Sequence, residues 1–381
     1  MNRPVIPRAI CLLGRGMAAF IFCFLFLFQT PAGCQEPKRP FTRGMFVSVI
    51  QDPPALSNTA AMTQLVEFAK TSDIHVLFVQ IYYANKAWFP SQVGDSTPYE
   101  ECLKNVGTDP FALLIEKAHA AGIEIHAWLN MLSLNNNQDA PLLKKYGPGI
   151  LTRDASEKKS LEDYKIDRQY FLEPGDPRTR EELVTLVAEI VRGYPDLDGI
   201  QFDYIRYPDN HPVYGRNEMN MQRFQKTAGL QTFEDSNPLW QDWKRAQVTE
   251  FLQMLIQRAR TIRSDIRISV TGCMPYARAY HEAFQDWSSW IDQGIVDFVT
   301  LMNYSPDPVQ FNRWNLQAME KTKNLNKVRI GVGAYKLVQS PEIFAKEFES
   351  CEKTGAGACV VFHYGALLEN AAMVQLLQVQ K

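Results

Sequence analysis

The sequence predicts a single α/β domain folded as a (β/α)8 TIM barrel. Short apolar runs typical of strands alternate with longer runs of helical period, and eight strand candidates follow one another in this way. Strands that alternate with helices pair in parallel, and eight such units close into a barrel. No fixed-period repeat or long low-complexity tract appears after residue 40, which argues against solenoids, propellers and linked domains.

The order of the elements favours a closed barrel over an open sheet. The strand candidates are residues 45–50, 76–82, 123–129, 199–202, 267–271, 298–302, 328–333 and 358–363. The helices expected between them are residues 59–71, 109–121, 179–193, 238–264, 286–294, 309–324 and 340–354. An open doubly wound sheet is the competing arrangement, but no Gly-x-Gly-x-x-Gly turn follows the first strand.

Two connections are longer than a barrel needs. Residues 130–170 follow the third strand and residues 207–237 follow the fourth, and both are rich in polar residues, Gly and Pro. Both leave the C-terminal ends of strands, where the active sites of barrel enzymes lie. We therefore expect these long loops to form lids or substrate walls.

The first 34 residues are typical of an export signal. Arg3, Arg8 and Arg15 precede an apolar run over residues 17–28, which is shorter than the roughly 20 residues that span a bilayer. We expect residues 1–34 to be removed and the barrel to occupy residues 35–381 of a periplasmic, surface-exposed or secreted protein. Two outcomes stay open at the cleavage site.

The segment Ala32-Gly33-Cys34 is similar to the end of a bacterial lipobox, although Pro31 stands where that motif usually has an aliphatic residue. Lipidation of Cys34 would attach the protein to a membrane. Ordinary cleavage near Gly33 would release a soluble one.

Charge and cysteine usage exclude several classes of function. The 40 basic and 42 acidic residues give a formal net charge of −2 without a long basic stretch, so we expect no nucleic-acid partner and an uncharged or weakly charged substrate. Cys102, Cys273, Cys351 and Cys359 form no Cys-x-x-Cys pair, so we expect neither a metal site nor a cofactor. Cys359 lies in an apolar run and is interpreted as a small core residue, and whether disulfides form stays open.

Asp203 is the best candidate for chemistry. Along the fourth strand, Ile200 and Phe202 suit the face toward the helices, which leaves Asp203 pointing into the barrel. It ends the strand at the rim where barrel enzymes do their chemistry, and Tyr204 and Arg206 follow. The alternative is that Asp203 caps the next element or pairs with Arg206.

Six short segments, spread in order over nearly all of the chain after residue 40, carry a resemblance to a known family. They are Arg43-Gly-Met-Phe46, His126-Ala-Trp-Leu-Asn130, Asp198-Gly-Ile-Gln-Phe-Asp-Tyr-Ile-Arg-Tyr-Pro208, Gln285-Asp-Trp287 with Trp290, Asp297-Phe-Val-Thr-Leu-Met-Asn-Tyr304 and Gly331-Val-Gly-Ala-Tyr335. Together they resemble the family 10-like glycosyl hydrolases, and the third segment is the most specific. The resemblance implies a TIM-barrel glycosidase of bacterial envelopes or secretions, and some members act on peptidoglycan glycan strands.

Glycoside hydrolysis usually needs two carboxyl groups, so Asp203 needs a partner. Asp286 could reach the rim after the fifth strand, but it could also be the N-cap of the following helix. Glu124 shares a strand face with His126 and could instead be an acid of the barrel floor. Glu173 could approach from a loop or simply be solvated. Retention or inversion depends on whether the carboxyl groups lie about 5 Å or about 6.5 to 9.5 Å apart.

Polar and aromatic residues at strand ends are expected to bind the sugar, because sugars stack on aromatic rings while a few polar groups take their hydroxyls. For each one a role in the core is the alternative. They are Gln80, Tyr82, His126, Trp128, Asn130, Tyr204, Arg206, Asn303, Tyr304, Tyr335 and His363. Trp287 and Trp290, three residues apart, are expected to pack a helix onto the barrel.

The leading hypothesis is therefore hydrolysis of O-glycosidic bonds in an extracytoplasmic polysaccharide by Asp203 and a second carboxylate. The alternative is a non-catalytic carbohydrate-binding barrel, with or without a lipid anchor. An esterase or deacetylase is disfavoured, because the sequence has no Gly-x-Ser-x-Gly nucleophile turn and no convincing metal-ligand cluster.

Overall fold

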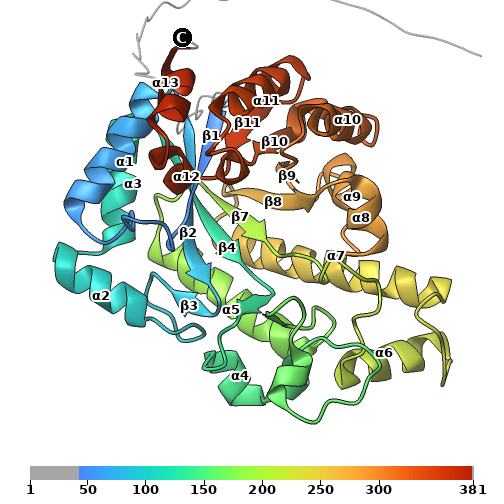
Figure 1. The fold of residues 1–381 in the computed structure, drawn as a ribbon. Helices are drawn as coiled ribbons and strands as arrows, with labels where there is room; N and C mark the ends of the chain where they lie inside the picture. Colours follow the sequence, from blue (N-terminus) through green and yellow to red (C-terminus); the bar gives the residue numbers. More distant parts are fainter. Residues whose placement is uncertain (1–42, 380–381) are drawn as a thin grey trace, which may run out of the picture. The chain divides into compact units, whose positions relative to one another are not determined.

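Eight parallel strands form a closed ring in the computed structural model, which describes residues 43–379. The ring runs in the order β1, β11, β10, β9, β8, β7, β4, β2, and β1 pairs with both β11 and β2. Figure 1 shows the strands at the centre with the helices around them. The predicted TIM barrel is confirmed. The predicted signal at residues 1–34, including Cys34, lies outside the described residues.

Each strand candidate corresponds to one barrel strand. The strands are β1 (Arg43–Val47), β2 (Val76–Tyr83), β4 (Glu124–Asn130), β7 (Gly199–Asp203), β8 (Arg267–Cys273), β9 (Phe298–Asn303), β10 (Val328–Val332) and β11 (Ala358–Val361). The first strand ends before the predicted residue 50, because the Gln51 side chain accepts a hydrogen bond from the Ser48 N–H and turns the chain there.

All seven predicted helices are present. They are α1 (Thr59–Thr71), α3 (Pro110–Ala120), α5 (Pro177–Gly193), α7 (Pro238–Ile262), α9 (Trp287–Asp292), α10 (Pro308–Met319) and α11 (Pro341–Lys353). Four of them begin with an Asp or Asn cap followed by proline, at Asp109, Asp176, Asn237 and Asp307. Trp287 and Trp290 are buried on α9 against the barrel, as predicted.

The structure adds elements that the sequence did not predict. Between the barrel strands lie β3 (Lys86–Ala87), α2 (Thr97–Val106), α8 (Tyr276–His281) and two 3-10 turns at Leu325–Lys327 and Ala334–Lys336. After the last strand come α12 (Tyr364–Leu368) and α13 (Ala371–Val379). Within residues 43–379, no helix is long and apolar enough to cross a membrane.

The two long connections are ordered rather than loop-like. The one after β4 holds β5 (Ser133–Asn135), α4 (Pro141–Tyr146), 3-10 turns at Pro148–Ile150 and Leu161–Tyr164, and β6 (Tyr170–Phe171). The one after β7 holds α6 (Glu218–Ala228). Both leave the C-terminal ends of their strands, as predicted, so they stand on the side of the barrel where a site is expected.

A buried carboxyl group joins these two connections. Glu173 follows β6 and is fully buried, where its Oε1 accepts hydrogen bonds from the Tyr207 hydroxyl at 2.5 Å and from the Gly175 N–H at 3.1 Å. Tyr207 belongs to the other connection. Burial raises the pKa of Glu173 to about 7, and hydrogen bonds from Tyr207, Thr152 and Gly175 oppose the rise. Glu173 is therefore a buried structural acid, not a solvated loop acid.

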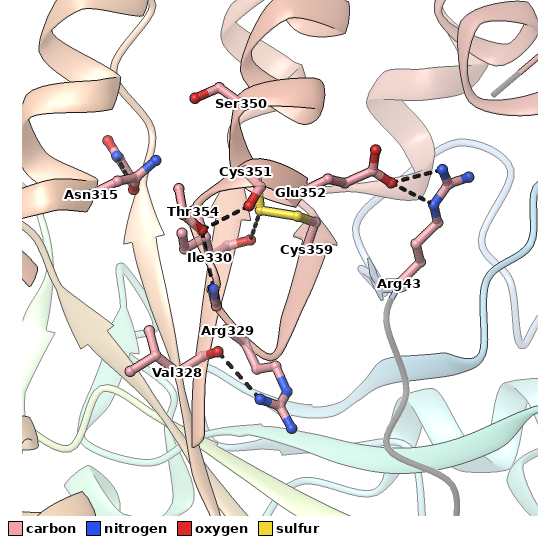
Figure 2. The surroundings of a disulfide bond; sticks show 12 residues. Arg43, Asn315, Val328, Arg329, Ile330, Ser350, Cys351, Glu352, Thr354 and Cys359 are labelled. Carbon is pink, nitrogen blue, oxygen red and sulfur yellow. Dashed lines mark hydrogen bonds and ion pairs between the residues drawn. A yellow bond between two sulfur atoms is a disulfide. The ribbon is translucent and has the colours of Figure 1, made fainter. Parts of the chain in front are cut away.

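The ring closes where β1 meets β11, and two side-chain links reinforce that seam (Figure 2). Arg43 on β1 donates to Glu352 on α11 through Nη2 at 2.7 Å and through Nε at 3.0 Å. Cys351 on α11 forms a disulfide with Cys359 on β11. Cys359 is thus buried, as predicted, and also bonded, which the sequence left open. A loop this short is worth about 2 to 3 kcal/mol in the chain-entropy description.

The core has an inner and an outer part. Phe46, Phe78, Trp128 and Phe298 form a cluster inside the ring, each nearly or fully buried. Ile200 belongs to the separate cluster between the strands and the helices, as strand alternation predicts. The inner cluster closes the barrel beneath its C-terminal end.

Glu173 makes stability depend on pH. Its pKa is raised from 4.5 to about 7, so between these values the folded protein holds a proton that the unfolded chain has lost. The contribution of this group to stability is therefore highest below pH 4.5 and falls as the pH rises to 7. Relative to Glu173→Gln, which does not titrate, the wild-type free energy of unfolding should fall by about 3 kcal/mol across this range. Urea titrations from pH 4.5 to 8 measure this difference, and a constant difference would contradict the prediction.

Candidate active site

A cavity of about 640 Å³ opens at the C-terminal end of the barrel. Residues at or just after the ends of all eight barrel strands line it, from Ser48 after β1 to His363 after β11. Trp314 of α10 adds part of the wall. The volume lies in the usual range for ligand sites, roughly 300 to 1,000 Å³.

Asp203 ends β7 in this cavity and is 5% exposed. Trp128 Nε1 of β4 donates to Oδ2 at 3.1 Å. The Thr271 hydroxyl of β8 and the Tyr204 N–H donate to Oδ1, the latter at 2.7 Å. Arg206 Nη1 lies 3.3 Å from the same oxygen. An ionised carboxylate only accepts hydrogen bonds, and every one of these contacts supplies a donor. The site is built around a carboxylate of fixed orientation.

The backbone just after Asp203 is unusual. Tyr204 adopts φ 55°, the left-handed region that residues other than glycine rarely occupy, and its ring lies 4.3 Å from the guanidinium carbon of Arg206. Such conformations cluster at functional sites, because the surrounding structure must hold them. Here the turn brings both the Tyr204 N–H and Arg206 back onto Asp203.

A second carboxylate, Asp209, lines the same cavity. Its Oδ2 lies 2.7 Å from Arg278 Nη2 and accepts a hydrogen bond from Cys273 Sγ at 3.5 Å, while Arg278 Nε donates to the Asp209 carbonyl. Sequence reasoning missed Asp209. The available signal was its position directly after Pro208, the last residue of the most specific segment.

Aromatic rings form one wall of the cavity. The Tyr304 ring lies 4.9 Å from Phe362 and 5.7 Å from Tyr335, and Trp128 lies 5.8 Å from Phe362. Gly333 makes room for Tyr304, because a Cβ there would come within 2.9 Å of the Tyr304 Cβ. Burial and the nearby Asp203 raise the pKa of Tyr304 well above its usual value, so its hydroxyl stays protonated. Flat rings and a few polar groups are what a sugar site requires.

The structure brings most of the expected binding residues together. The eight that line the cavity are Gln80, Trp128, Asn130, Tyr204, Arg206, Tyr304, Tyr335 and His363. Tyr83, Trp314, Arg278 and Phe362 also line it, although sequence reasoning had not selected them. Among residues 43–379, no group of three or more His, Cys, Asp or Glu side chains is placed to hold a metal ion.

Three expected binding residues lie elsewhere. Tyr82 is buried outside the cavity, because the pairing of β2 with β4 shifts register between residues 80 and 82, and Tyr83 reaches the cavity instead. His126 is fully buried one layer deeper, beside Phe78. Asn303 faces α10, where its Nδ2 donates to the Phe311 carbonyl at 2.9 Å.

The two acids expected to assist Asp203 do not reach it. Glu124 is the first residue of β4, at the opposite end of the strand from the cavity, where it pairs with Arg267. Asp286 accepts hydrogen bonds from the Ser289 N–H at 3.2 Å and from the Tyr276 hydroxyl at 2.7 Å. Asp286 is thus the N-cap of α9 and Glu124 an acid of the barrel floor. A catalytic role for either does not fit this geometry.

Comparison with known proteins agrees with this arrangement. The model of the family described as glycosyl hydrolase-like 10 matches residues 43–349. The chain belongs to that family. It is 21% identical over 357 residues to the glycosyl hydrolase DigH of Escherichia coli K12, covering 83% of this chain and 78% of DigH. It is 24% identical over 280 residues to the glycosyl hydrolase YngK of Bacillus subtilis, covering 66% of this chain and 51% of YngK.

Solved TIM-barrel glycosidases share the fold of this family member. The catalytic domain of β-amylase from Paenibacillus polymyxa superposes with a TM-score of 0.57 at 12% identity, covering 90% of this chain and 98% of that one. The endo-β-1,4-mannanase from Thermotoga petrophila gives a TM-score of 0.57 at 13% identity, covering 90% and 76%. At such identities the likeness concerns the architecture alone.

Thr271 offers a test of how this glycosyl hydrolase-like site holds its carboxylate. Thr271→Val keeps the shape of a side chain that is 2% exposed but removes the hydroxyl that donates to Asp203 Oδ1. If Asp203 carries the reaction, turnover should fall about 10- to 100-fold, because the variant removes one of the donors that orient this carboxylate. The melting temperature should change by only a few degrees. Steady-state kinetics with thermal melts measure both effects, and full turnover in the variant would contradict the role.

Proposed function

We propose that the protein hydrolyses O-glycosidic bonds in an extracytoplasmic polysaccharide, with Asp203 as its central carboxylate. The observation that carries the proposal is a buried Asp203, oriented by donors from three directions, in a cavity walled by aromatic rings. Membership of a glycosyl hydrolase-like family supports the same reaction class.

Asp203 and Asp209 are the proposed pair. Asp203, held as an acceptor, would attack the anomeric carbon or activate a water molecule. Asp209 would protonate the leaving oxygen. Its Oδ2 is occupied by Arg278 and Cys273, whereas no donor within the described chain bonds its Oδ1. This oxygen is therefore available to a ligand.

The polysaccharide is proposed to lie outside the cytoplasm. The Cys351–Cys359 disulfide supports this location, since disulfides persist in oxidising compartments. The signal expected at residues 1–34 would provide the route, and lipidation of Cys34 would attach the protein to a membrane. Glycan strands of peptidoglycan are the candidate substrate that the family resemblance implies.

A non-catalytic carbohydrate-binding barrel is the second candidate. It is favoured by the pairing of each cavity carboxylate with an arginine, Asp203 with Arg206 at 3.3 Å and Asp209 with Arg278 at 2.7 Å. A carboxylate that an arginine already holds can act as a fixed acceptor for sugar hydroxyl groups without taking part in proton transfer. Binding of a glycan without release of reducing ends would support this candidate.

Asp203→Asn tests the hydrolytic role. The variant keeps the shape and can still accept from Thr271, but it lacks the negative charge that the reaction needs. We expect the release of reducing ends from a panel of polysaccharides, including peptide-free peptidoglycan strands, to fall at least about 1,000-fold. Asp286→Asn is the matched control, because it makes the same change in an N-cap outside the cavity and should keep turnover within about twofold. Equal rates for wild type and Asp203→Asn would refute the proposal.

Asp209→Asn tests the partner. If Asp209 protonates the leaving oxygen, the variant should lose about 100-fold or more on a polysaccharide. It should keep most of its rate on a dinitrophenyl glycoside, whose leaving group departs without a proton. Parallel kinetics on the two substrates measure the difference. An equal loss on both would assign Asp209 to binding rather than to proton transfer.

A further inference from the structure

We infer that Gln80 is a positioning residue that orients the Asn130 amide, so that its N–H group points into the cavity beside Asp203 and selects an oxygen substituent on the sugar. The inference rests on the proposed function in one respect, since it takes a sugar to be the occupant of the cavity. The evidence for it is a chain of hydrogen bonds from Ser48 after β1, through Gln80 of β2, to Asn130 of β4.

The Gln80 amide has one possible orientation. Its Oε1 accepts hydrogen bonds from the Ser48 hydroxyl at 2.9 Å and from the Val49 N–H at 3.2 Å. A backbone N–H can only donate, so the atom facing Val49 must be the oxygen. Ser48 is fixed in turn, because its own N–H donates to Gln51 Oε1 at 3.2 Å. Gln80 is 2% exposed and therefore has little freedom to turn.

Gln80 passes this orientation to Asn130. The Gln80 Nε2 donates to Asn130 Oδ1 at 3.1 Å, which leaves the Asn130 Nδ2 on the other side of its amide. Within the part of the chain that the structure describes, no protein acceptor bonds that nitrogen, and Asn130 lines the cavity. Asn130 of β4 is the register neighbour of Asp203 of β7. An unused donor therefore stands beside the central carboxylate.

The position of this donor defines what it recognises. If Asp203 acts at the anomeric carbon, a donor beside it faces the groups next to that carbon, which are the ring oxygen and the C2 substituent. Of these two, only the C2 substituent differs from one glycan to another. Hydrogen bonds to that substituent strengthen in the transition state of many glycosidases. A hydroxyl or an acetamido carbonyl can accept from the amide N–H. An ammonium group cannot, and it would leave two donors facing each other.

Three β-1,4-linked hexasaccharides that differ only at C2 provide the test. They are cellohexaose with hydroxyl groups, chitohexaose with acetamido groups and fully deacetylated chitohexaose, all measured at about pH 5 so that the amines of the third are ammonium groups. Calorimetry should show wild-type protein binding the better of the first two at least about 30-fold more tightly than the third. In Gln80→Leu, Asn130 is still present but free to rotate, so this preference should shrink about 10-fold or more.

A matched control separates positioning from general damage. Gln247→Leu makes the same change at a fully buried amide outside the cavity, where Oε1 accepts hydrogen bonds from Arg180 and Arg223. It should lower the melting temperature and leave the C2 preference unchanged. If Gln80→Leu folds poorly, Asn130→Ala tests the chain from its other end and should also lose the preference.

The outcomes distinguish this inference from the proposed function. Tight binding of the ammonium hexasaccharide by wild type, or an unchanged preference in both Gln80→Leu and Asn130→Ala, would overturn the inference alone. A wild-type protein that keeps the preference but releases no reducing ends from any glycan would overturn the hydrolytic proposal alone. Absence of binding to all three hexasaccharides would overturn the inference together with the assignment of a sugar to this cavity.

Discussion

Closure of the strand ring between β1 and β11 is the constraint on which the rest of the structure depends. In an open sheet the ends of the first and last strands would lie far apart, whereas here Ser48 and His363 line one cavity. Among the described residues, the seam pairs residues 43–45 with residues 359–361. The Arg43–Glu352 pair joins β1 to α11, and the Cys351–Cys359 disulfide joins α11 to β11, so both links lie beside this seam.

Register between neighbouring strands sets the chemistry of the cavity. Asp203 takes its donors from the strands on both sides, Trp128 of β4 and Thr271 of β8. Asn130 reaches its position beside Asp203 through the same pairing of β4 with β7. Because side chains alternate between the two faces, a slip of one residue in either pair would turn the donors toward the helices. The pairing that builds the barrel therefore also builds the carboxylate site.

The sequence predicted the features that follow from the periodicity of strands and helices. It did not predict features that depend on how far along the barrel axis a residue lies or on the course of a loop. Alternation along β7 predicted that Asp203 points inward. The same rule placed Glu124 on the inner face of β4 and left a catalytic role and a place in the barrel floor both open, and the structure shows the second. Tyr82 was misplaced because a register shift in β2 breaks the alternation. Asp209 pairs with Arg278, which belongs to the short helix α8. The sequence did not predict this helix, so no local pattern connected the two residues.

Glu173 and Asp203 are both buried acids, but they differ in the groups that surround them. Burial raises the pKa of Glu173 to about 7, although Tyr207, Thr152 and Gly175 donate hydrogen bonds to it. Asp203 is almost as buried but meets a tryptophan, a threonine, a backbone N–H and an arginine. The charged residues that line the cavity, Asp203 and Asp209 against Arg206, Arg278 and Lys336, leave one positive charge in excess. A polycationic glycan would therefore meet a charge of the same sign, which would add to the discrimination that we propose for the N–H of Asn130.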